Sequence, residues 1–234
     1  MSTLASAFRR SSTWLLLLSA ALLFSGCDAL KKQAREQYYS YLEDVGFEKR
    51  DLLVKRVDRA RDAQEDAQEE FEDALEQFQA LVGHEGGELE AVYNKLKGKF
   101  DDAESRAEKV NERIRKVENV AEALFEEWQT EIGELKNADY RRQSESSLRD
   151  TKSRYTQLVG KMKQAASTMD PVLAKLRDQV LFLKHNLNAQ ALGSLEGEAT
   201  NLEADVSQLI VEMQASIAEA DSFIRDMTKK PAQS

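Results

Sequence analysis

The side chains that could perform chemistry are few in this chain of 234 residues. Its two histidines are His84, which lies beside Glu85 in a glycine-rich run, and His185. A zinc site requires several nitrogen or sulfur donors, so we expect His84 to be a solvated loop residue. His185 has Asn186 and Asn188 as polar neighbours, and we expect this group to set the register inside a helical core. Recognition of a partner by the same three side chains is the alternative.

The carboxylates are numerous, but their arrangement is that of charged helix faces. No acidic residue stands alone in an apolar run, as a general acid with a raised pKa would require. The dense group from Asp62 to Glu70 lacks the glycine turn of a calcium-binding loop. The chain also contains no phosphate-binding loop and no nucleophile motif. We therefore predict a protein that is not an enzyme and that uses no cofactor and no metal.

The only cysteine, Cys27, follows a segment typical of protein export. Arg9 and Arg10 precede an eleven-residue apolar run, Trp14 to Phe24. As a helix this run is about 16 Å long, which is too short to cross a bilayer. The tetrapeptide Phe24-Ser25-Gly26-Cys27 resembles the bacterial lipobox, although the lipobox usually begins with leucine. An ordinary signal peptide that leaves an unpaired thiol is the alternative.

The lipobox resemblance implies that signal peptidase II removes residues 1–26 and that Cys27 carries acyl chains. Several acyl chains hold a protein on a bilayer that a single chain binds only marginally. Asp28 follows the cysteine, and in enterobacterial lipoproteins an aspartate at this place is associated with retention at the inner membrane. That sorting rule differs between bacterial groups. We expect the periplasmic face of the bacterial cell envelope, with the inner membrane favoured over the outer membrane.

Net charge limits the partners. The charge of −9 becomes −11 once the signal segment is removed, because two arginines and no acid precede Cys27. An acidic surface of this size repels phosphate backbones and anionic lipid headgroups. These charges disfavour a nucleic-acid role and membrane binding through the body of the protein, so we expect no nucleic-acid partner, and the anchor on Cys27 is the expected membrane contact.

Composition and periodicity predict the fold class. Ala, Leu, Glu, Lys and Arg make up about half of the chain, whereas Gly and Pro together number twelve. Apolar residues recur in alternating steps of four and three, which is the pattern of a heptad seam. Four such stretches run from Leu53 to Leu81, Leu89 to Leu135, Leu148 to Leu187 and Leu195 to Met227, with Gln64 as the single polar member of the first. We predict an all-α fold, an elongated antiparallel helical bundle or coiled coil of about four long helices.

Local signals predict where these helices end. Gly83 should end the first helix, because glycine adopts the left-handed conformation most easily. The pattern weakens from Asn137 to Asp139, where either terminal residue could cap a new helix. Pro171 predicts a kink or a break in the third helix. Gly193 is expected to end that helix and Ser194 to cap the fourth.

The chain is therefore expected to contain four parts. Residues between the anchor and the bundle include Tyr38 and Tyr39, which could lie in the headgroup layer or pack on the bundle. The predicted boundaries are 1–26 for the removed signal peptide, 27–46 for a lipid-anchored membrane-proximal segment, 47–229 for an elongated helical coiled-coil domain and 230–234 for a disordered tail.

Several runs of residues resemble one bacterial family. They are Tyr38-Tyr39-Ser40, Val45-Gly46, Lys49-Arg50-Asp51, residues 60–64, Gly86-Gly87, residues 120–125 and, above all, residues 178–189, which read DQVLFLKHNLNA. The family is one of gammaproteobacterial lipoproteins, catalogued as domain of unknown function number twenty-nine fifty-nine, and the resemblance covers nearly all of the mature chain. It implies secretion, a lipid anchor and helices, and it implies no activity and no catalytic residues.

Two functional hypotheses follow from these features. The first is a non-enzymatic, lipid-anchored periplasmic helical scaffold, spacer or interaction module that binds a protein of the envelope. The alternative is a membrane-remodelling or envelope-stress protein whose long helices self-assemble, and a homo-oligomer stays open in both cases.

Overall fold

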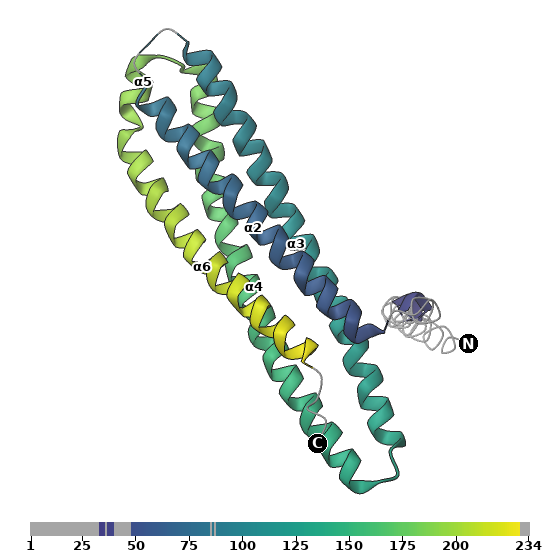
Figure 1. Cartoon of the computed structure of the whole chain (residues 1–234). Helices are drawn as coiled ribbons and strands as arrows, with labels where there is room; N and C mark the ends of the chain where they lie inside the picture. Colours follow the sequence, from purple (N-terminus) through teal and green to yellow (C-terminus); the bar gives the residue numbers. More distant parts are fainter. Residues whose placement is uncertain (1–32, 36, 40–47, 85, 87, 230–234) are drawn as a thin grey trace, which may run out of the picture. The chain divides into compact units, whose positions relative to one another are not determined.

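The computed structural model describes residues 33–35, 37–39, 48–84, 86 and 88–229 (Figure 1). The chain divides into two compact units, Met1–Lys49 and Arg50–Ser234. Every regular element in the described ranges is a helix and none is a strand, so the all-α prediction is confirmed. None of these helices is both long and apolar enough to span a membrane.

Long helices make up the second unit. They are α2 (Lys49–Val82), α3 (Leu89–Glu134), α4 (Ala138–His185) and α6 (Glu196–Thr228), with the six-residue α5 (Ala189–Ser194) between the last two. The 46 residues of α3 correspond to about 69 Å of helix.

Consecutive long helices run in opposite directions, as Figure 1 shows. Lys175 of α4 pairs with Asp205 of α6, whereas Arg154 lies 2.7 Å from Asp226. The residue of α4 that comes earlier in the chain therefore pairs with the residue of α6 that comes later. This order shows that the two helices are antiparallel. The closest backbone approaches join α3 to α4 and α4 to α6, and α2 contacts α3 and α6 through its side chains.

The predicted seams form the core of this unit. In α2 every seam position is buried, including Gln64, and the apolar seam positions of the other long helices are mostly buried as well. The buried positions of α2 that match the predicted stretch are Leu53, Val57, Ala60, Gln64, Ala67, Phe71, Ala74, Phe78 and Leu81. Long helices that pack against one another through heptad seams are therefore confirmed.

Two predicted helix ends are also confirmed. The first long helix ends at Val82, directly before Gly83, whose amide donates to the Gln79 carbonyl at 2.9 Å. Asn137 caps α4, because its side-chain oxygen accepts hydrogen bonds from the backbone amides of Asp139 at 2.8 Å and Tyr140 at 3.2 Å. Asn137 is therefore the cap and Asp139 is not.

The predicted end of the third helix is wrong. The helix ends at His185, eight residues before Gly193, which lies inside α5. Asparagine side chains explain the early stop: the Asn186 amide donates to the Phe182 carbonyl at 2.9 Å, and the Asn188 oxygen caps α5. Such side chains offer the backbone an alternative to helical hydrogen bonds.

Two further predictions concern the same helix and its successor. α4 continues through Pro171 from Ala138 to His185, so the predicted break is absent, and the predicted kink stays a prediction. Ser194 does not cap the last helix: α6 follows Leu195 without a side-chain cap, and the Ser194 hydroxyl donates to the Ala191 carbonyl at 2.7 Å.

Candidate functional site

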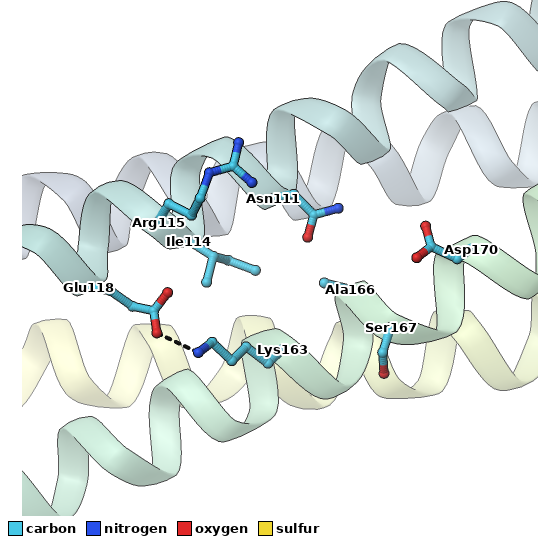
Figure 2. A pocket seen from close by; sticks show the side chains of 8 residues that line it. All are labelled: Asn111, Ile114, Arg115, Glu118, Lys163, Ala166, Ser167 and Asp170. Atoms are coloured by element: carbon cyan, nitrogen blue, oxygen red, sulfur yellow. Dashed lines mark ion pairs between the residues drawn. The ribbon is translucent and has the colours of Figure 1, made fainter. Parts of the chain in front are cut away.

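A shallow groove of about 260 Å³ lies between α3 and α4 (Figure 2). Because the two helices are antiparallel, the groove brings together residues that are about fifty positions apart in the sequence. Its lining consists of Asn111, Ile114, Arg115 and Glu118 from α3 and Lys163, Ala166, Ser167 and Asp170 from α4.

The polar groups of this groove do not form a reactive constellation. Figure 2 shows Glu118 and Lys163 pointing toward each other across the two helices, where they form an ion pair. The Asn111 amide donates to the Ala107 carbonyl at 3.2 Å, and the Ser167 hydroxyl donates to the Gln164 carbonyl at 2.8 Å. These four side chains are engaged within their own helices or with each other.

The acidic group from Asp62 to Glu70 serves to attach α2 to its neighbours. Arg106 of α3 lies 2.7 Å from Asp66, and Lys99 lies 3.1 Å from Glu70. Hydrogen bonds from the Lys99 ammonium to Asp73 and Glu70 raise its pKa. Among the described residues, no group of three or more His, Cys, Asp or Glu side chains could hold a metal ion.

The histidines differ from the sequence-based expectations. His84 is only partly exposed, and its buried Nε2 atom has no hydrogen-bond partner, so it is not fully solvated. His185, Asn186 and Asn188 are exposed, and the prediction that they set register in the core is therefore wrong. The reason is that α4 ends at His185, which places the asparagines in the connection to α5.

An exposed apolar pair lies beside these polar residues. Leu181 is 55% exposed and Phe182 is 41% exposed, although both belong to the last turns of a helix whose other face is buried. The heptad pattern of the stretch from Leu148 to Leu187 does not predict this pair, because its seam positions here are Val180 and Leu183, which are both buried. The missed signal is the unbroken apolar run, since four consecutive residues cannot all lie on one face of a helix.

We call Leu181, Phe182 and His185 the α4-end surface. A single exposed apolar residue is ordinary on a protein surface, whereas Leu181 and Phe182 are adjacent and together form a larger exposed apolar surface. The predicted lipidation residue Cys27 and the predicted sorting residue Asp28 lie outside the described residues.

Long antiparallel helices with a buried heptad core and a charged exterior define a helical-bundle protein. The chain belongs to the family described as "Protein of unknown function (DUF2959)", whose sequence model matches residues 38–227. The match begins before α2 and reaches the last turn of α6. Comparison with curated proteins gave no match.

Proposed function

We propose that this chain is a non-enzymatic lipoprotein of the bacterial envelope, whose helical bundle binds and positions another envelope protein. The export segment followed by Cys27 supports the lipid anchor, and Asp28 favours the inner membrane. The buried seams support a structural role, because the apolar periodicity of the long helices is used to hold the bundle together.

The observation that carries the proposal is the exposed α4-end surface. Burial of the exposed parts of Leu181 and Phe182 against a partner would contribute on the order of 1 kcal/mol each. His185 and Asn186 flank them and are exposed, so they supply polar contacts at the rim. An apolar centre with a polar rim is the ordinary composition of a protein interface.

The anchor is tested by metabolic labelling with palmitate in the native bacterium. The wild-type chain is expected to incorporate the label and to fractionate with membranes, whereas Cys27→Ser is expected to lose both properties. Persistent labelling of Cys27→Ser would overturn the lipid anchor.

The partner contact is tested by the size of the complex that gentle detergent extracts from membranes. The double variant Leu181→Ser/Phe182→Ser is expected to migrate on native gels as the chain alone, while the wild type migrates as a larger species. Val211→Ser is the matched control, because Val211 is 59% exposed on α6 and lies away from the α4 end. A larger species that contains only copies of this chain would instead support the self-assembly alternative.

A further inference from the structure

Two polar side chains face each other in the core between α2 and α6. Gln64 and Ser216 have no exposed surface, and the Ser216 hydroxyl donates to the Gln64 Oε1 atom at 2.9 Å. The other end of the same carboxamide, the Gln64 Nε2 atom, is buried without a hydrogen-bond partner. The Ser216 hydroxyl binds only the oxygen of the Gln64 carboxamide, so the amide nitrogen is left without a hydrogen-bond partner.

The surroundings of the pair offer no replacement. The adjacent seam positions on α2 are Ala60 and Ala67, and those on α6 are Met213 and Ala220, all of them buried and apolar. A buried amide without a partner loses the hydrogen bonds that it makes to water. The Gln64 amide lacks these hydrogen bonds only while α2 is packed in the bundle. It regains them when α2 separates and water reaches Gln64.

Outside its buried apolar seam, α2 is bordered by ion pairs to both of its neighbours. Arg61 lies 3.0 Å from Asp221 of α6, and Asp66 lies 2.7 Å from Arg106 of α3. All four side chains are partly exposed, so salt screens their attraction. α4 also forms border ion pairs, such as Arg154 with Asp226, but its backbone approaches those of α3 and α6 closely, which the backbone of α2 rarely does.

From these observations we propose that α2 is the opening element of the bundle. It separates as a unit, beginning from Lys49 and remaining joined at Gly83, while α3, α4 and α6 stay packed on one another. Separation hydrates Gln64 and exposes the core side of α3 and α6 to a partner or to solvent. This separation depends only on the buried Gln64 amide and on the contacts of α2 with α3 and α6.

The position of α2 in the chain means that a pulling force could cause the separation of α2. α2 is the first long helix after the predicted membrane-proximal segment, so a pull on the residues before Lys49 acts on α2 first. This consequence rests on the proposed lipid anchor, whereas the opening does not. Hydrogen exchange on the purified protein therefore tests the opening even if Cys27 carries no lipid.

The experiment is amide hydrogen exchange of the full purified chain, read by mass spectrometry of proteolytic fragments. Fragments of α2 are expected to exchange roughly tenfold faster than fragments of α3, α4 and α6 with the same burial. Raising the salt concentration from about 0.05 M to about 0.5 M should accelerate α2 more than α4, because salt screens the ion pairs of both helices but only α4 also has close backbone contacts with its neighbours. Equal exchange of α2 and α4 at both salt concentrations would overturn the proposal.

A substitution tests how much the Gln64 amide contributes to the separation of α2, apart from the ion pairs. Gln64→Met keeps the approximate volume and removes the polar group, so it is expected to slow exchange in α2 several-fold and to leave α3 and α4 unchanged. Gln214→Met is the matched control, because Gln214 is exposed on α6 and is expected to change nothing. Equal slowing of all the long helices by Gln64→Met would show global stabilisation and would contradict a separate opening of α2. If Gln64→Met does not fold, the salt comparison on the wild type still decides.

Discussion

The Ser216 hydroxyl and the Gln64 carboxamide oxygen lie 2.9 Å apart in the core, where neither side chain has any exposed surface. This pair joins the first and last long helices of the bundle, which are 152 positions apart at this contact. A slip of α2 against α6 would place both groups among apolar side chains. The pair therefore specifies the register of the two helices.

The first prediction follows from this pair. Ser216→Ala removes the only partner of Gln64, so it should lower the free energy of unfolding by about 1–3 kcal/mol. Adding Gln64→Met to this variant should recover most of the loss, because no polar group is then buried without a partner. Urea unfolding of the single and double variants measures both effects, and two additive losses would contradict the pairing.

Asn137 gives a second prediction. Its side-chain oxygen caps the first turn of α4, so Asn137→Ala should lower the free energy of unfolding by about 1 kcal/mol. Asn94→Ala provides the control, because Asn94 is exposed in the interior of α3 and alanine is the better helix former there. Thermal unfolding compares the two variants, and a neutral Asn137→Ala would show that the cap is not formed in solution.

A third prediction concerns Pro171. This residue is exposed inside α4 and donates no backbone hydrogen bond, so Pro171→Ala should raise the free energy of unfolding by about 1–3 kcal/mol. Gly160→Ala in the same helix should raise it by about 1 kcal/mol, because an added Cβ meets no atom within 4 Å. Calorimetry on both variants gives the comparison. Destabilisation by Pro171→Ala would mean that the proline has a structural role that the continuous helix does not reveal.

Acid stability gives a fourth prediction. Hydrogen bonds from Thr168, at 2.6 Å, and from Gln208, at 3.0 Å, lower the pKa of Glu212. A carboxylate whose pKa is lower in the folded state stabilises the fold above its unfolded pKa, and this contribution is lost as the pH falls through the folded pKa. Thr168→Val should therefore raise the pKa of Glu212 and reduce stability at neutral pH more than at acidic pH.

Two measurements check that prediction. Titration of the Glu212 carboxyl by NMR should show its midpoint moving upward in Thr168→Val. Unfolding experiments at neutral pH and at the lowest pH at which the chain stays folded should show the loss shrinking toward acid. A loss that is independent of pH would assign the effect of Thr168 to packing.

The core of the bundle could be predicted because heptad periodicity states which positions are buried, and Gln64 already stood out as the polar member of its seam. Its partner Ser216 could not be predicted, since the pairing depends on how α2 and α6 align in space. The end of α4 was missed for a local reason: the Asn186 and Asn188 side chains take over the backbone hydrogen bonds that would extend the helix. The groove between α3 and α4 depends on the antiparallel alignment of Asn111 with Asp170, which periodicity alone does not supply.

Position-specific photocrosslinking in intact cells tests the central proposal most directly. A photoreactive amino acid placed at Phe182, and in a second strain at Val211, compares the α4-end surface with an exposed apolar position elsewhere on the bundle. We predict a discrete adduct with one envelope protein from position 182, its loss when Leu181→Ser is added, and no such adduct from position 211. Equal or absent crosslinking at the two positions would contradict a scaffold that binds its partner through the end of α4.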